Sequence, residues 1–178
     1  MTYVTLDGVY LDILILSHLR SAPVHGYELK RKVSATTAFA LHNNTLYPSL
    51  RRFEEAGAVR KTAETQEGRP PRHVYELTDV GHELLHEMLA EFPAEIAGSD
   101  DEFLTRVGMF DDLTPTERRG VLDARDEALA QRLAHLTELG ARARSSRRGW
   151  GDRVTAELID RVHRERAWIA VLRTKAGR

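Results

Sequence analysis

A short strand-like stretch interrupts a chain whose other apolar residues follow helical spacing. Val59–Glu64 and His73–Leu77 read as two strands. Between them lies Gln66–Arg72, a loop that is stiffened by two prolines and carries two arginines. A single hairpin that follows one set of helices and precedes another leaves few folds open. The helices on its N-terminal side decide which of them applies.

Three helices are expected before the hairpin. The first runs from a cap at Asp7 to about Arg20 and is apolar nearly all round, which predicts burial. The second covers about His25–Ser34. The third covers Asn43–Gly57 and closes at its glycine, a residue that tolerates the left-handed conformation. Because a short connection joins the second and third, they form a helix-turn-helix, and the hairpin after them makes a winged helix.

The third helix has two unlike faces. Leu46, Leu50 and Phe53 form a stripe that packs into a core. The remaining positions hold side chains that donate hydrogen bonds, stack or carry positive charge: Asn44, Thr45, Tyr47, Pro48, Arg51 and Arg52. Such a face either reads nucleic acid or is simply solvated. Asn43 and Asn44 suit an N-cap as well as a base contact, and both roles stay open.

The charge of the whole chain gives no case for nucleic acid, because the formal net charge is -1. Its distribution is more informative. Basic residues outnumber acidic ones between Arg20 and Arg72, whereas acidic residues gather between Glu83 and Glu102. The winged-helix segment is therefore expected to be locally positive, and arginines in the loop of the hairpin favour contact with phosphates. The alternative is a β-ribbon that only covers the edge of the core.

Helix-start signals recur beyond the hairpin. Thr78-Asp79 caps a helix that stops near Pro93, and Ser99–Glu102 has the spacing of a capping box before a helix through Phe103 and Phe110. Thr114–Glu117 repeats this signal with proline at the first helical position. The sequence thus predicts a second, wholly helical region.

The last two predicted helices are long. One carries a heptad-like leucine seam to about Arg144, and the other repeats the pattern after a basic turn at Ser145–Gly151. A hairpin of two such helices has more apolar surface than it can bury alone, so dimerisation is expected. The predicted fold is mainly α: a winged helix-turn-helix DNA-binding domain at 1–92 and an α-helical dimerisation or effector domain at 93–178.

Several blocks of this sequence resemble the PadR family of transcriptional regulators. They are His25–Leu29, Asn44–Leu50, Glu54–Gly57, Gly68–Arg72 and Tyr75–Gly81. Their order and spacing match from about Leu6 to Leu89, and the combination is specific although each block alone is weak. The region from Phe103 to Leu136 also resembles the α-helical C-terminal domain of the longer PadR subfamily.

The resemblance implies a homodimer whose winged helices enter the major grooves of a pseudo-palindromic operator on double-stranded DNA. Family members are mostly repressors, often released by phenolic acids, other aromatic compounds, drugs or peptides. Two departures from the family pattern concern recognition. Asn44 stands where many members have glycine, and a second proline follows Pro70 in the wing. Base contacts and the reach of the wing are therefore expected to differ.

The resemblance also assigns roles to individual residues. Thr45, Tyr47 and Pro48 match the family's reading helix and are expected to meet bases. Phosphate or guanine contacts are expected from Arg51 and Arg52, with a solvated helix face as the alternative. The remaining predicted DNA contacts lie on the second helix and in the wing: Tyr27, Lys30, Arg69 and Arg72. Tyr27 fits a core aromatic equally well.

One motif points to a different class of protein. His82-Glu83-x-x-His86 has the pattern of zinc peptidases, which places two imidazoles one helical turn apart. Leu89 and Phe92 stand where an extended metal motif needs glycine or histidine, so a non-enzymatic protein without catalytic residues, metal or cofactor is expected. A winged helix that binds only proteins is a third reading, which leaves its arginines unexplained.

Effector and compartment are the least constrained features. An aromatic or drug-like effector is expected to lie against side chains of the C-terminal helices: Trp168, Trp150, Met109 and Phe110. Aromatic residues at this spacing also commonly form part of a core.

The chain has no cysteine, no signal-peptide pattern and no apolar run long enough for a bilayer. We therefore expect a cytoplasmic protein that does not contact membranes.

Overall fold

The computed structural model describes residues 8–37, 42–66, 69–145 and 149–177. They belong to two compact units, Met1–Leu89 and Ala90–Arg178, each of which is described by itself. The fold is mainly α with one small sheet, which confirms the predicted fold class. The assignment of separate functions to 1–92 and 93–178 stays a prediction.

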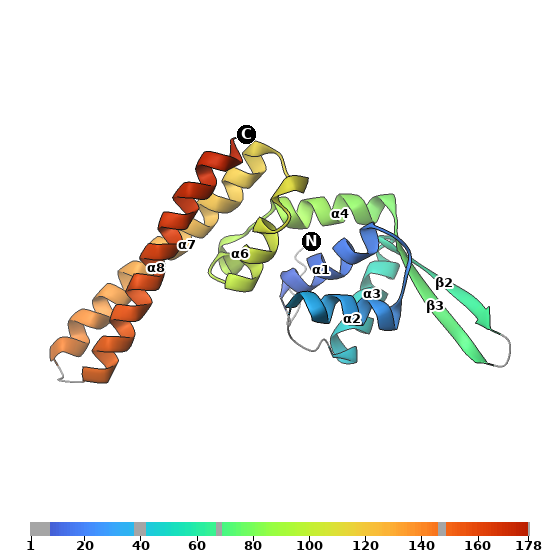
Figure 1. Ribbon diagram of the computed structural model, residues 1–178, viewed down its shortest axis with the longest axis horizontal. Coiled ribbons are helices and arrows are strands. Elements are labelled where there is room, and N and C mark those ends of the chain that lie inside the picture. Colours follow the sequence, from blue (N-terminus) through green and yellow to red (C-terminus); the bar gives the residue numbers. More distant parts are fainter. Residues whose placement is uncertain (1–7, 38–41, 67–68, 146–148, 178) are drawn as a thin grey trace. The chain divides into compact units, whose positions relative to one another are not determined.

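The first unit is a winged helix (Figure 1). Its helices and strands follow in the order α1 (Val9–Arg20), β1 (Val24–His25), α2 (Gly26–Thr37), α3 (Asn43–Glu55), β2 (Val59–Gln66), β3 (Arg69–Leu77) and α4 (Asp79–Ala90). The apolar stripes of the first three helices meet in one core, whose most buried residues include Ile13, Ile15, Leu16, Leu29, Val33, Leu46, Leu50 and Phe53. Burial of these stripes is the main force that holds α3 in place.

The sheet is antiparallel with the order β1-β3-β2, and β2 and β3 extend beyond the helices as a two-stranded ribbon (Figure 1). Strand β1 was not predicted, because two residues are too few to show an alternating pattern. The expected loop Gln66–Arg72 is also wrong: β3 begins at Arg69. Proline cannot donate to a strand ladder, yet Pro70 and Pro71 lie within β3. On one side β1 pairs only with Val74 and Tyr75, and on the other side the pairing with β2 is irregular between Glu64 and Gln66, so neither proline interrupts a regular ladder.

The two ends of α3 differ in how well the sequence predicted them. The N-cap is His42, whose extended backbone (φ -82°, ψ 150°) precedes the helix without a side-chain capping bond. Asn43 and Asn44 are the first helical residues, so the capping role considered for them is wrong. Gly57 has a φ of 73°, which confirms the left-handed closure. The predicted cap at Asp7 lies outside the described residues.

The predicted cap of α4 is present. The hydroxyl of Thr78 accepts a hydrogen bond from the Gly81 amide at 3.2 Å and donates one to the Gly57 carbonyl at 2.7 Å. The Ala58 carbonyl accepts a further bond from the Thr78 amide at 3.1 Å. One residue thus starts α4 and ties it to the turn that follows α3.

The second unit is helical. It contains α5 (Ala94–Ala97), α6 (Asp100–Val107), the 3₁₀ turn η1 (Phe110–Asp112), α7 (Pro115–Ser145) and α8 (Gly149–Ala176). The predicted capping signals are confirmed: the Ser99 hydroxyl accepts from the Glu102 amide, and Thr114 and Glu117 bond reciprocally. Two boundaries are wrong. Helix α6 ends before Phe110, and α8 begins at Gly149, which places Trp150 in a helix rather than in the turn.

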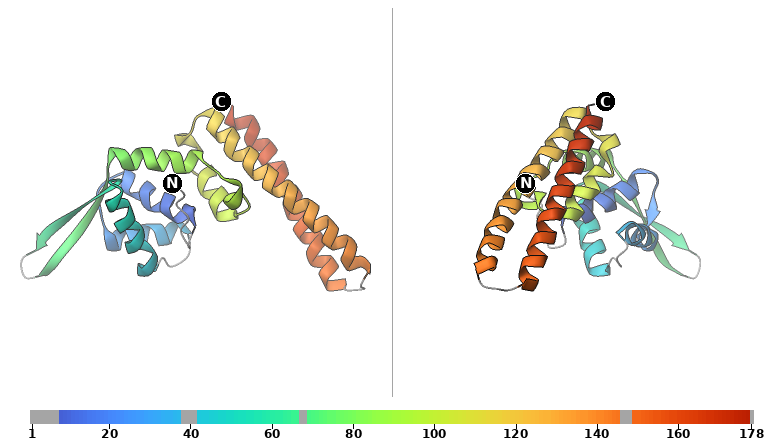
Figure 2. Two further views of the ribbon diagram at one scale, coloured as in Figure 1. Left: turned by 180° about the vertical axis from the view of Figure 1, so that it is seen from behind. Right: turned by 60° about the vertical axis from the view of Figure 1, so that its left-hand side comes forward.

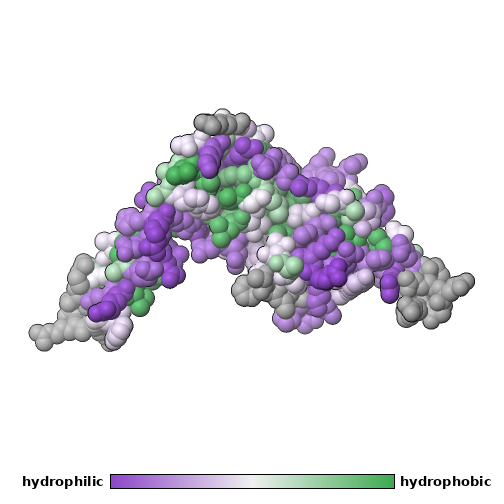
Figure 3. Space-filling model, viewed as in Figure 1, coloured by the Kyte–Doolittle hydropathy of each residue, from purple (hydrophilic) through white to green (hydrophobic). Residues whose placement is uncertain are grey.

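Helices α7 and α8 lie side by side along their lengths (Figure 2). Their facing sides bury a seam of residues: Leu122, Leu129, Leu136, Val162 and Ile169. Hydrophobic residues also remain on the outside among hydrophilic ones (Figure 3), and Val154 and Val171 are each more than half exposed. No described helix has the length and apolar character that crossing a bilayer requires.

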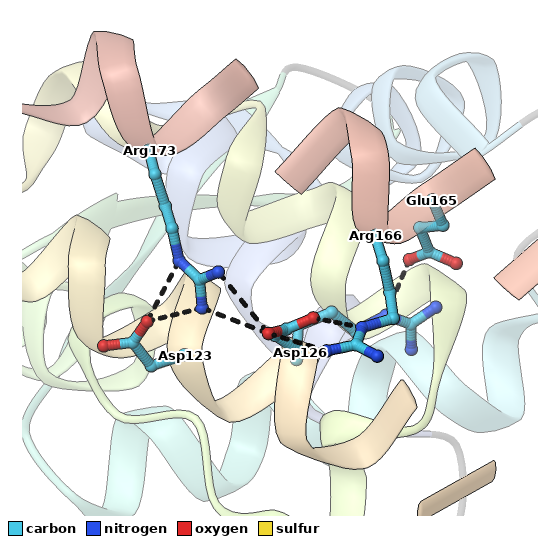
Figure 4. A network of polar contacts seen from close by, with 6 residues as sticks. Asp123, Asp126, Glu165, Arg166 and Arg173 are labelled. Atoms are coloured by element: carbon cyan, nitrogen blue, oxygen red, sulfur yellow. Dashed lines mark hydrogen bonds and ion pairs between the residues drawn. The ribbon is translucent and has the colours of Figure 1, made fainter. Parts of the chain in front are cut away.

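Ion pairs cross from α8 to α7 at the N-terminal part of α7 (Figure 4). Arg166 Nε donates to Asp126 Oδ1 at 2.7 Å, and Arg173 donates to Asp123 at 2.7 Å and to Asp126 at 3.4 Å. The hydrogen bond from Arg166, together with the two positive charges, lowers the pKa of Asp126. The folded protein therefore prefers the ionised carboxylate at this position.

Acidification should weaken the α7–α8 pair through Asp126. A carboxyl group whose pKa is lowered by folding stabilises the folded state above its unfolded pKa of about 3.9, and this contribution is lost as pH falls through the folded value. Asp126→Asn should therefore unfold at lower urea than the wild type near neutral pH, and the difference should shrink near about pH 3. Tryptophan fluorescence measures the transition, since Trp150 and Trp168 both lie in α8. Asp160→Asn, an exposed change on the same helix, is the control; an equal loss in both variants would contradict the assignment.

Candidate nucleic-acid interface

The exposed face of α3 carries the polar part of the predicted reading surface. Asn44, Pro48 and Arg51 are exposed, and Tyr47 is 42% exposed although its neighbour Leu46 is fully buried. Pro48 lies in the second helical turn and has no N–H to offer the carbonyl of Asn44. The front of α3 therefore presents side chains and a backbone acceptor together.

Helix α2 supplies a cation to the start of α3. Lys30 Nζ donates a hydrogen bond to Asn43 Oδ1 at 2.8 Å. Asn43 thus has a partner in the neighbouring helix rather than a capping role. The bond places the Lys30 ammonium beside the first turn of α3, where positive charge favours an approaching phosphate.

An open hollow of about 370 Å³ lies between the start of α2, α3 and the wing. It is lined by His25, Gly26, Tyr27, Tyr47, Arg72, His73 and Tyr75. A Cβ on Gly26 would lie 3.3 Å from ring atoms of both Tyr47 and Tyr75, so glycine allows this close approach. Burial, followed by the neighbouring Tyr47 and Glu54, raises the pKa of Tyr75.

Two histidines in this hollow were not singled out from the sequence. His25 stacks on Tyr27 with ring centroids 6.1 Å apart, and its Nε2 lies 3.8 Å from the Glu64 carboxylate of β2. His73 lies on β3 beside Arg72 and is exposed. The hollow thus combines aromatic faces, hydroxyl donors and one permanent cation, which suits a sugar-phosphate backbone.

The wing contributes basic side chains from the strands themselves. Arg72 is exposed on β3 opposite Glu64, and Arg60 on β2 pairs with Glu76 at 3.5 Å. Arg69 is the first residue of β3, but its side chain lies outside the described part. Of the two predicted wing arginines, only Arg72 is therefore placed against the hollow.

Arg51 and Arg52 do not share the outer face of α3 as predicted. Arg51 is exposed. Arg52 turns inward, where its Nη2 donates to Asp12 Oδ2 of α1 at 2.5 Å, and Asp12 is only 2% exposed. This ion pair did not follow from the sequence, because the partner lies 40 residues earlier in the chain, and DNA contact by Arg52 stays a prediction. The only sign of this ion pair in the sequence is Asp12, an acidic residue within an otherwise apolar run.

The predicted effector residues are not brought together. Trp168 packs edge-on against Phe103 with centroids 5.9 Å apart and lines a hollow of about 330 Å³ with Leu104 and charged side chains of α6 and α8. Trp150 is 81% exposed and lines a separate hollow of about 350 Å³ on α8. Met109 and Phe110 are half-buried near the end of α6 and line neither of these two hollows.

The zinc-peptidase motif lies on α4. His82, Glu83 and His86 are exposed. Within the described residues, no three or more His, Asp or Glu side chains gather as a metal ion would need. The geometry thus offers no third ligand there, and the peptidase alternative has no support.

A winged helix with a polar, partly basic face on its third helix belongs to the nucleic-acid-binding class. The sequence model of the transcriptional regulator PadR-like family matches residues 15–87. A PadR family transcriptional regulator from Eggerthella lenta is 38% identical, over 45% of this chain and 69% of that one, with a TM-score of 0.41. A PadR-like regulator from Bacillus cereus is 32% identical, over 46% of this chain and 79% of that one, with a TM-score of 0.40. The chain belongs to the PadR-like family of transcriptional regulators.

A longer relative covers both units of the chain. Bacillus subtilis PadR, solved in complex with operator DNA, is 18% identical over 93% of this chain and 97% of its own, with a TM-score of 0.43. No curated protein matched the sequence. Family membership therefore rests on the winged-helix sequence, which is the part shared with the relatives of higher identity.

Proposed function

We propose that the protein is a cytoplasmic transcriptional regulator, most simply a repressor, that binds double-stranded DNA through α3 and the wing. One observation supports this proposal most. Tyr47, Pro48 and Arg51 are all exposed on α3, and next to them lies a hollow that is lined by Arg72 of the wing. In this proposal Asn44, Thr45, Tyr47 and Pro48 meet base edges in the major groove. Contacts to phosphates come from Tyr27, Lys30, Arg51, Arg69 and Arg72.

The proposed active form is a homodimer joined through α7 and α8. Apolar side chains left outside the α7–α8 seam, among them Val154 and Val171, support this assignment. A two-fold dimer presents two reading helices about one DNA turn apart, which fits a pseudo-palindromic operator. The C-terminal helices thus set the spacing at which the winged helices bind.

The proposed regulation acts on that spacing. Of the predicted effector residues, Trp168 has the best support, because it lines a hollow with Leu104 and with both basic and acidic residues: Arg161, Arg164, Asp100 and Glu165. An aromatic ligand there would shift α6 against α8 and so favour a dimer whose winged helices no longer match two half-sites. Quenching of Trp168 fluorescence by a panel of aromatic acids, lost in Trp168→Leu but kept in Trp150→Leu, tests this site.

A gel-shift with the DNA upstream of the protein's own gene tests the main proposal. A discrete complex should form at low salt, survive an excess of unrelated duplex, and weaken steeply between about 50 and 200 mM salt. Size-exclusion chromatography with light scattering gives the oligomeric state of the same sample. A folded dimer that forms no complex with this DNA or with unrelated DNA at low salt would overturn the proposal.

A further inference from the structure

We infer that Asp12 is a positioning residue that withholds the charge of Arg52 from DNA, so that α3 offers phosphates one arginine instead of two. The inference rests on the proposed function. It concerns the part of the protein's affinity for DNA that does not depend on the base sequence. Its basis is the contrast between Arg51 and Arg52, which are adjacent in sequence and lie about 100° apart around the helix. Arg51 is exposed, whereas Arg52 is half-buried and its guanidinium is bound to the buried Asp12.

The contacts of Arg52 hold it inward at several points. Besides the bond to Asp12, its Nη2 lies 3.5 Å from the Ser49 hydroxyl, and its guanidinium lies 5.2 Å from the centre of the Phe53 ring. Its Nε is buried without a hydrogen-bond partner among the described residues, and the side chain as a whole is 31% exposed. Ser49 and Phe53 are themselves buried. The guanidinium is therefore held by Asp12, Ser49 and the Phe53 ring together.

The relative cost of alternatives favours the inward position. If Arg52 left to reach a phosphate, the buried Asp12 carboxylate would lose its hydrogen bond to this guanidinium, and weakening the compensation of a buried charge is unfavourable. An ion pair between an exposed arginine and a phosphate contributes little free energy by comparison. The Asp12–Arg52 ion pair should therefore persist when DNA binds, and Arg52 should displace no counterion from the DNA phosphates.

The charge on the reading helix thus depends on a residue in α1. An arginine–phosphate contact is the same for every DNA sequence, so each added contact strengthens binding to operator and to unrelated DNA alike. Since unrelated sites vastly outnumber operators, limiting this contribution keeps the protein mobile on DNA. Asp12 thus limits the number of phosphate contacts without itself touching DNA.

The test compares salt dependence in matched variants of the full chain. The affinity of each for a random-sequence duplex and for the upstream duplex is measured by fluorescence anisotropy across a salt series. Arg51→Met should reduce the slope of log K against log salt by about 0.9 per subunit, whereas Arg52→Met should leave it unchanged. Asp12→Asn should raise the slope by about 0.9 per subunit and strengthen random-duplex binding about fivefold per subunit near physiological salt.

A second comparison covers the case in which a single variant fails to fold, which circular dichroism detects. Asp12→Leu/Arg52→Met removes both charges, and apolar replacement of a buried pair often preserves stability. This double variant should keep the wild-type slope. A slope that falls in Arg52→Met or in the double variant as much as in Arg51→Met would overturn the inference, as would an unchanged slope in folded Asp12→Asn. Absence of DNA binding by the wild type would instead overturn the proposed function, and this inference with it.

Discussion

Replacing Arg125 by leucine should lower the free energy of unfolding of the C-terminal unit by about 1–3 kcal/mol. Arg125 lies on α7 and its side chain is almost fully buried. Its Nε donates to Glu165 of α8 at 2.7 Å, its Nη1 to the Ala97 carbonyl at 2.9 Å, and its Nη2 to Asp100 at 2.5 Å. Leucine would leave all three acceptors without this donor.

The electrostatic balance at Arg125 shows why the effect should be large. Burial alone would lower the pKa of the guanidinium, but the hydrogen bonds and charges of Glu165 and Asp100 outweigh it and raise that pKa. The guanidinium also lies 5.2 Å from the centre of the Phe103 ring, so it contributes packing as well as charge. One side chain therefore connects α5, α6, α7 and α8.

Urea unfolding followed by tryptophan fluorescence measures this loss. Both tryptophans of the chain lie in α8, so the signal reports the C-terminal unit. Arg132→Leu, at an exposed position of the same helix, should stay within about 0.5 kcal/mol of the wild type. A loss of stability in Arg125→Leu no larger than in this control would show that the buried network contributes little.

Replacing Gly81 by alanine should destabilise the winged helix by about 3 kcal/mol or more. A Cβ at this position would lie 2.1 Å from the Ala58 carbonyl oxygen and 2.5 Å from Leu77 Cδ1. The carbonyl cannot move aside cheaply, because it accepts the Thr78 amide at 3.1 Å. Helix α4 would have to leave the end of the hairpin, and the wing would lose its anchor to α3.

Far-UV circular dichroism during thermal unfolding measures this effect, and Gly120→Ala provides the control. No atom lies within 4 Å of a Cβ added to Gly120, an exposed position in α7. Alanine there should stabilise the helix by about 0.5–1 kcal/mol, since glycine is a poor helix former. Opposite signs for the two glycines are therefore expected. A Gly81→Ala protein with wild-type stability and DNA affinity would contradict the close approach of α4 to the hairpin.

Local signals in the sequence predicted local structure well. The buried stripe of α3, its closure at Gly57 and the capping residues Ser99 and Thr114 all follow from interactions within a few residues. The wing was predicted too short for a related reason. Two consecutive prolines are typical of loops, and only the open edge of β3, together with its irregular pairing between Glu64 and Gln66 of β2, explains why a strand accommodates them.

Long-range pairings were beyond sequence reasoning. Arg52, Arg106 and Arg125 are arginines that a sequence cannot distinguish from solvated ones, because their environment depends on segments distant in the chain. Arg52 pairs with α1, and Arg125 with α6 and α8. Arg106 bonds its helical neighbour Glu102, but its burial against the Phe92 ring depends on the segment before α5. Only the tertiary fold shows which basic residues remain available to DNA.

The affinity of Arg72→Gln for upstream DNA across a salt series tests the central claim most directly. Arg72 is exposed and lines the hollow between wing and α3, so its loss should weaken binding and reduce the slope of log K against log salt by about 0.9 per subunit. Arg132→Gln, on α7, removes the same charge at a position remote in sequence and should behave as the wild type. Equal affinities and slopes for Arg72→Gln and wild type would contradict a DNA-binding surface formed by α3 and the wing.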